Sequence, residues 1–267
     1  STIKRANRHL KNGTTTIEVK SGYGLTVSEE LKMLRAIKKA NKEALPELIS
    51  TCLAAHMLPK DFEGTKKEYL KMISKELFPI LKEENLTHRI DAFADDIQAY
   101  FSKASEMNFD ITVHADQFSA GGSKVAVEFN AISADHLEAS GDTEIALLAQ
   151  SDTISVALPG ASIGLGCDFT PARKLLDAGA ALAIASDHNP GSAPMGDLLT
   201  QASILGTFQK LTNAEVLAGI TFRAAAALKL EDRGKLEAGR SADLAVFHSD
   251  NYQDILYNQG NLKPCMV

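Results

Sequence analysis

Residues 181–192 read ALAIASDHNPGS, a run of small apolar residues that stops abruptly in polar ones. Short runs rich in apolar and β-branched residues are typical of strands buried on both faces of a parallel sheet. The same pattern recurs along the chain, each time before a stretch that carries apolar residues at helical spacing. The expected strands are residues 14–20, 49–56, 89–95, 110–116, 131–138, 153–160 and 181–188.

This alternation of strands and helices predicts an α/β fold built on a parallel sheet. Strands in series, each followed by a helix or a helical turn, favour a TIM-type (β/α)8 barrel whose first strand is absent. An open doubly wound sheet is the alternative, but it needs a glycine-rich phosphate loop after an early strand, and the glycines of KSGYGL (20–25) fit a turn better. The expected helices are 28–43 with Ser28 as N-cap, 65–84, 97–108, 121–130, 142–150, and 172–179 ending at Gly179.

The chain divides into two expected parts. Residues 1–232 form the barrel, and its last stretch, 194–230, reads as helices with Asn213 as a candidate cap. Residues 233–267 are predicted to supply the C-terminal strands of a small β-sandwich, because 239–247 (GRSADLAVF) alternates like a strand. A barrel without its first strand has two unpaired edges. We therefore expect these residues alone to be poorly stable and inactive, and the complete parent protein to be active.

Composition narrows the class of partner. The net charge of -6 comes from 34 acidic and 28 basic residues without a long run of either sign. This balance argues against nucleic acid or an anionic membrane and favours a small-molecule ligand. Cys52, Cys167 and Cys265 are too few and too scattered for a disulfide framework, which indicates a reducing, cytoplasmic compartment. Cys167 is expected to be a small buried residue.

The side chains best suited to catalysis or metal binding lie where the predicted strands end. We expect them to lie close together, because the loops after barrel strands converge on one face. His114 and Asp187 offer a nitrogen and an oxygen donor of the kind that suits zinc or iron, one donor fewer than a catalytic zinc usually takes from protein. Asp116 either shares the face of His114 or caps the next helix. Lys20 is a candidate metal-bridging or Schiff-base lysine, but we expect a loop lysine paired with Glu18 or solvent. The histidines at predicted strand ends are His56, His114, His136 and His188, whereas His9, His88 and His248 are expected to be structural or exposed.

The chain resembles the amidohydrolase superfamily across nearly its whole length. Within it, the chain closely resembles the hydrolases that open the cyclic amide of 4-imidazolone-5-propanoate to N-formimidoyl-L-glutamate in histidine degradation. The stretches that carry the resemblance are GTTTIEVKSGYGL (13–25), AAHMLP (54–59), VHADQFS (113–119), DHLE (135–138), ALPGA (157–161), ASDHNPGS (185–192), GITFRAAAALKL (219–230) and LEAGRSADLAVF (236–247).

The resemblance implies a homodimer with one Zn²⁺ or Fe³⁺ per subunit, held by His114, Asp187 and an H-x-H pair that these residues do not contain. His136 would transfer protons beside a metal-bound water, and Asp187 would take the proton of that water. Gln117 would act in both catalysis and binding. The substrate contacts implied are Tyr23, His56, Gln117, Asn189, Gly191 and Ser192, the last three on the substrate carboxylate.

Two other functions stay open at this point. One is a neighbouring amidohydrolase or aminohydrolase, such as a formimidoylglutamate deiminase, which activity on the two substrates would separate. The other is a non-catalytic barrel fragment that lacks the full metal site.

Overall fold

Seven parallel strands lie side by side in chain order across one sheet. The computed structural model describes residues 1–94 and 97–267, so Asp95, predicted to end the third strand, lies outside the described residues. Each predicted strand is present, although the ends differ by a few residues: the second strand begins two residues earlier than predicted, and the others are shorter than predicted. The strands are β1 (Thr16–Lys20), β2 (Glu47–Ala55), β3 (Arg89–Phe93), β4 (Asp110–Ala115), β5 (Ser133–His136), β6 (Ile154–Ala157) and β7 (Leu182–Ile184).

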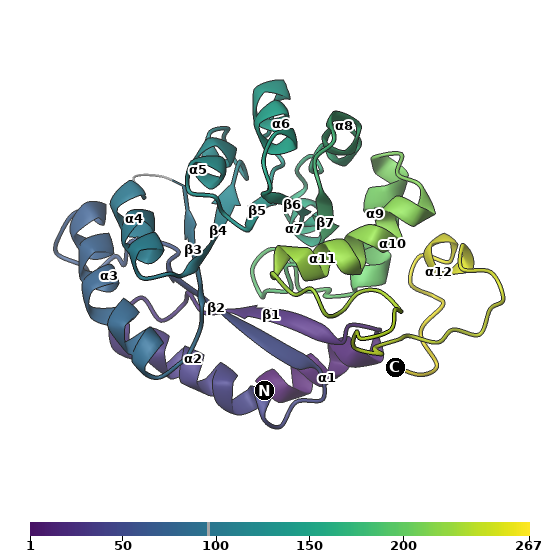
Figure 1. The fold of residues 1–267 in the computed structure, drawn as a ribbon, viewed down its shortest axis with the longest axis horizontal. Helices are drawn as coiled ribbons and strands as arrows, with labels where there is room; N and C mark the ends of the chain where they lie inside the picture. The colour runs from purple at the N-terminus through teal and green to yellow at the C-terminus, as the bar shows by residue number, and fades with distance from the viewer. Residues whose placement is uncertain (95–96) are drawn as a thin grey trace.

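The sheet curls, with helices along its outer side (Figure 1). Its sequential strand order lacks the reversal that defines a doubly wound sheet, so that alternative is wrong. In the part of the chain that the structure describes, β1 and β7 each pair with one neighbouring strand only. The α/β, TIM-type architecture predicted from sequence is therefore confirmed as a curled, open half-barrel.

Helix starts are set by side chains that accept hydrogen bonds from the first free backbone N–H groups. Thr26, not Ser28, caps the second helix, and Thr212, not Asn213, caps the tenth, because each threonine accepts from the N–H three residues on. Gly179, with φ of 96°, ends its helix as predicted. The helices are α1 (Thr2–Lys11), α2 (Val27–Asn41), α3 (Lys66–Glu83), α4 (Gln98–Glu106), α5 (Gly122–Glu128), α6 (Asp142–Ala149), α7 (Pro159–Leu165), α8 (Ala172–Ala178), α9 (Leu198–Phe208), α10 (Asn213–Ile220), α11 (Phe222–Ala227) and α12 (Asp254–Tyr257).

The apolar core lies between the sheet and the outer helices. Phe78 of α3 is fully buried and packs its ring 5.0 Å from Tyr100 of α4 and 5.2 Å from Phe109. The strands also bury many polar side chains, which face the inside of the curl. These buried polar residues of the strands are Thr51, Arg89, Asp91, Thr112, Ser133, Asp135, His136 and Ser155.

The C-terminal segment differs from its prediction. Residues 239–247 do not form the expected strand; a single antiparallel bridge joins Val246 to Met266. A strand needs a partner of matching length for its backbone groups, and this segment has only that one bridge among the described residues. The division of the chain at residue 232 stays a prediction. Among the described residues, no helix has the length and apolar character to cross a membrane.

Glu215 links two outer helices. Its carboxylate accepts a hydrogen bond from the backbone N–H of Thr212 at 2.7 Å and pairs with Arg173 of α8 at 3.0 Å. Hydrogen bonds from Arg173 and from the Thr212 backbone lower the pKa of Glu215 to about 2. A depressed carboxyl pKa contributes stability above the unfolded-state value, and this contribution is lost as the pH falls through the folded-state value.

Replacing Glu215 by Gln should therefore lower the free energy of unfolding by about 1 kcal/mol at neutral pH, the upper range for an exposed ion pair. The difference from wild type should shrink as the pH falls from 4.5 to about 2. Urea unfolding at several pH values measures it. Glu68→Gln changes the matching cap position of α3, which has no arginine partner, and should have the smaller effect. A difference that stays constant with pH would contradict this assignment.

Candidate active site

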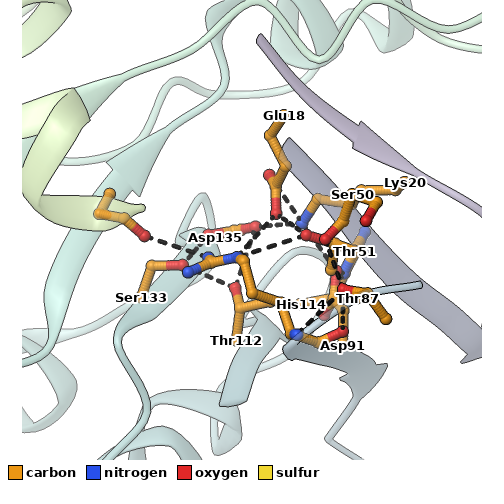
Figure 2. Close-up of polar contacts among 12 residues, drawn as sticks. Glu18, Lys20, Ser50, Thr51, Thr87, Asp91, Thr112, His114, Ser133 and Asp135 are labelled. Carbon is orange, nitrogen blue, oxygen red and sulfur yellow. Dashed lines mark hydrogen bonds and ion pairs between the residues drawn. The ribbon is translucent and has the colours of Figure 1, made fainter. Parts of the chain in front are cut away.

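A buried cluster of charges lies inside the curl of the sheet (Figure 2). The ammonium of Lys20, at the end of β1, lies 2.7 Å from Asp91 of β3 and 2.6 Å from Asp135 of β5. Side chains from alternate strands form one layer in a barrel interior, and these three follow that rule. Burial disfavours the charged form of Lys20, but Asp135 and Asp91 outweigh it and raise the pKa of Lys20 well above its ordinary value.

This arrangement corrects the expectation for Lys20. The predicted approach to Glu18 exists at 3.6 Å, but the two stronger partners are the aspartates of β3 and β5. The side chain keeps 23% of its surface accessible, so the lysine belongs to the interior and not to a solvated loop. The sequence analysis missed both aspartates. An acidic residue inside a short strand, such as Asp91 in RIDAF (89–93), is the signal that could have identified them.

His114 stands at the edge of this cluster. Its Nδ1 lies 3.0 Å from the carboxylate of Asp91. Burial disfavours the protonated ring, but Asp91 outweighs it and raises the pKa of His114. The His136 ring lies 5.2 Å from that of His114, and the His56 ring 6.4 Å from it. Phe93 of β3, which the sequence analysis also missed, packs between His56 and His114, with its ring 5.6 and 4.7 Å from theirs.

The loop after β1 brings Tyr23 and His56 together. The carboxylate of Glu30, which is buried, accepts hydrogen bonds from the N–H groups of Gly22 and Gly24 at 3.0 and 2.6 Å and thereby holds the loop. His56 donates from Nδ1 to the carbonyl of Gly22 at 3.2 Å, because a carbonyl only accepts. The Tyr23 ring, itself exposed, meets the His56 ring edge-on at 5.3 Å.

His136 ends β5 in a strained backbone. Its φ is 86° and that of Leu137 is 70°, a region that residues with a side chain seldom adopt. Among the described residues, the buried Nδ1 of His136 has no hydrogen-bond partner, and it lies 3.5 Å from Glu138 Oε1. Such strain persists where the surrounding structure imposes it, and it is concentrated at functional sites. It therefore agrees with a functional position for this side chain.

The turn after β7 begins at Asp187, where φ is 47°. Burial raises the pKa of Asp187, although His136 and His114 oppose this effect. Asn189 donates from Nδ2 to the Asp187 carboxylate at 3.1 Å, and its Oδ1 accepts from the N–H groups of Gly191 and Ser192, both at 2.8 Å. The backbone donors expected to bind a substrate carboxylate are thus already paired within the turn.

Four other predicted residues have different surroundings. Asp116 accepts from the Ser123 backbone at 3.2 Å and from Ser140 Oγ at 2.7 Å, so it holds the start of α5, one of its two predicted roles. His188 does not join the histidines of the rim: its Nε2 lies 2.9 Å from Arg8, and its ring packs on His9. Cys167 is exposed, contrary to expectation, because it follows the left-handed turn at Gly166 that ends α7. Gln117 is half-buried just after β4.

The donor atoms on the rim do not by themselves make a complete metal site. Within residues 1–94 and 97–267, no three His, Cys, Asp or Glu side chains come together closely enough to hold a metal ion. His114 and Asp187 therefore amount to two donors of suitable type.

Comparison with known proteins assigns this chain to a protein family. The profile of the amidohydrolase family matches residues 2–256, and the chain belongs to that family. Because their sequence identity is low, the similar solved structures support the fold and nothing beyond it. A 5-methylcytosine deaminase from Klebsiella pneumoniae superposes with a TM-score of 0.76 at 16% identity, over 98% of this chain and 71% of that one. An adenosine deaminase from Xanthomonas campestris with bound zinc gives 0.71 at 19% identity, over 100% and 69%.

The curated relatives share one name, imidazolonepropionase. The protein from Alkaliphilus oremlandii is 35% identical over 96% of this chain and 63% of its own length. That from Bacillus velezensis is 38% identical over 95% and 62%, and that from Acinetobacter baumannii is 36% identical over 100% and 69%. The chain thus spans about two thirds of the length of the relatives it matches.

The Asp187–Ser192 turn and the residue before it pack closely against two glycines of α7. A Cβ on Gly164 would overlap the carbonyl oxygen of Ser192, and one on Gly160 would meet the carbonyl oxygen of Ser186. Gly164→Ala should therefore destabilise the protein by about 1–3 kcal/mol through overpacking, although alanine is the better helix former.

Thermal unfolding and the backbone amide shifts of Ser192 and Ala193 measure this effect. Ile163→Ala, at an exposed position of the same helix, should leave both nearly unchanged. Equal behaviour of the two variants would show that the turn does not depend on the close approach of Gly164.

Proposed function

We propose that this protein hydrolyses the cyclic amide of 4-imidazolone-5-propanoate to N-formimidoyl-L-glutamate. The observation that carries the proposal is identity of 35–38% to imidazolonepropionases over nearly the whole chain, with His114, His136 and Asp187 on one rim. Opening a cyclic amide needs a nucleophilic water, a group that takes its proton and a group that protonates the departing nitrogen. Parallel strand ends that converge on one face supply such groups.

The roles proposed for the rim residues are those that the resemblance to the family implies. Asp187 takes the proton of the attacking water, with its carboxylate held by Asn189 at 3.1 Å. His136 stabilises the developing oxyanion or passes a proton to the departing nitrogen. Gln117 assists both catalysis and binding. The substrate contacts proposed are Tyr23, His56, Gln117, Asn189, Gly191 and Ser192.

We also propose one Zn²⁺ or Fe³⁺ per subunit, with His114 and Asp187 as two of its ligands. Support comes from the family and from the chemistry of an imidazole and a carboxylate donor. Further ligands are needed to complete the coordination. When bound, such an ion makes a water molecule nucleophilic near neutral pH.

A cytoplasmic location and a homodimer complete the proposal. Cys52, Cys167 and Cys265 are all free thiols, which fits a reducing compartment. The homodimer rests on family resemblance, and sedimentation velocity tests it.

Activity on two substrates separates this function from its alternative. We expect the purified full-length protein to consume 4-imidazolone-5-propanoate and form N-formimidoyl-L-glutamate, followed by ultraviolet absorbance and mass spectrometry. A formimidoylglutamate deiminase would instead release ammonia from N-formimidoyl-L-glutamate, and that result would overturn the proposal.

Loss of the proton-transfer group should be specific to catalysis. His136→Asn should lower kcat by about 10²–10⁴-fold, the usual contribution of a positioned acid or base. Its KM should change little. His88→Asn, at an exposed position before β3, is the matched control and should retain wild-type kcat. An active His136→Asn enzyme would remove this residue from the chemistry.

Metal content tests the proposed ligands. Elemental analysis should find about one zinc or iron per chain, and His114→Ala and Asp187→Ala should each lose it together with hydrolysis. Metal retained in both variants would show that these residues are not ligands. Neither metal nor turnover in the unaltered protein would show that His114 and Asp187 form only part of a site.

A further inference from the structure

The Lys20 ammonium has three N–H donors, and three acids surround it. Asp135 and Asp91 lie at hydrogen-bonding distance, 2.6 and 2.7 Å, and Glu18 lies at 3.6 Å. Two of its three donors are thus bound to carboxylates of the protein, and the third acid lies close by. Lys20 is therefore built to hold other side chains in place and not to act on a substrate itself.

Asp91 connects this lysine to the rim. Its side chain is fully buried, its Oδ2 accepts from Lys20, and its carboxylate faces Nδ1 of His114 at 3.0 Å (Figure 2). An ionised carboxylate only accepts hydrogen bonds, so Nδ1 of His114 carries a proton, and in the neutral ring Nε2 presents its lone pair. The hydrogen bond at one ring nitrogen thereby decides the chemistry of the other.

We propose that Lys20 is a positioning residue of the active site, acting through Asp91 to fix the orientation and the tautomer of His114. Lys20 clamps Asp91 to Asp135, so the Asp91 carboxylate stays turned toward Nδ1 of His114. This inference deepens the proposed hydrolase function, and its expected effect on kcat rests on that function. The tautomer of His114 can be measured without substrate, so that part of the inference is tested independently.

The other buried cation of the interior does not replace Lys20. Arg89 pairs with Glu18 at 3.5 Å and donates to Thr51 at 3.3 Å and to the carbonyl of Ala227 at 3.1 Å. Without Lys20, the described partner left to Asp91 is His114 itself. The carboxylate would then be free to turn, and His114 would populate both tautomers.

Long-range ¹H–¹⁵N NMR of the metal-free protein measures the tautomer directly, with His114→Gln used to assign the signal. We expect wild type to show a single form protonated at Nδ1, and Lys20→Met to show a mixture or the opposite form. Lys20→Arg keeps the charge and should restore the wild-type form. Lys32→Met, an exposed lysine paired with Glu29, is the control and should leave the signal unchanged.

A folded Lys20→Met protein with the wild-type tautomer would overturn the inference. If that variant does not fold, Lys20→Gln, which keeps a donor but not the charge, replaces it. A changed tautomer in that variant would again support the inference, and the wild-type tautomer would overturn it.

Kinetics distinguish failure of this inference from failure of the proposed function. Lys20→Met should lower kcat by at least about tenfold, with KM near wild type, because substrate contacts are untouched. If wild type shows the expected tautomer but does not hydrolyse 4-imidazolone-5-propanoate, the proposed function fails and the positioning role stands. If hydrolysis occurs but kcat and the tautomer are unchanged in Lys20→Met, the positioning role fails.

Discussion

The ion cluster of Lys20, Asp91 and Asp135 is the constraint on which the interior of this protein depends. Barrel interiors are commonly filled with branched apolar side chains, but here the polar side chains of the strands face inward and the apolar core lies outside, under the helices. Buried charges lose their hydration, and only complete pairing compensates for that loss. The three strands that carry the cluster, β1, β3 and β5, must therefore keep their register.

The rim is built directly on this cluster. His114 is held by Asp91, and His136 follows Asp135 on the same strand. Phe93, two residues beyond Asp91, packs between the rings of His56 and His114. The charged layer and the rim are thus contributed by neighbouring positions of the same strands.

Much of the architecture could be predicted from sequence because its signals are local. Apolar strands and helical spacing recur regularly, and the strands and outer helices appear where these patterns lie. The errors arose where several local solutions compete. Ser28 and Thr26 are both suitable caps, and geometry selects Thr26. Residues 239–247 have strand-like alternation, but a strand also needs a partner, and one bridge to Met266 is what they find.

The sequence by itself determined the order of strands and helices and which polar residues lie near the end of each strand, because backbone propensity and apolar spacing act over a few neighbouring residues. Only the tertiary structure decided which of those residues meet. Lys20 pairs with partners 71 and 115 residues away, and His188 turns to Arg8, 180 residues away. The donors of Gly191 and Ser192 are likewise taken by Asn189 within the turn. Pairings of this kind depend on the curl and register of the sheet, which no short stretch of sequence encodes.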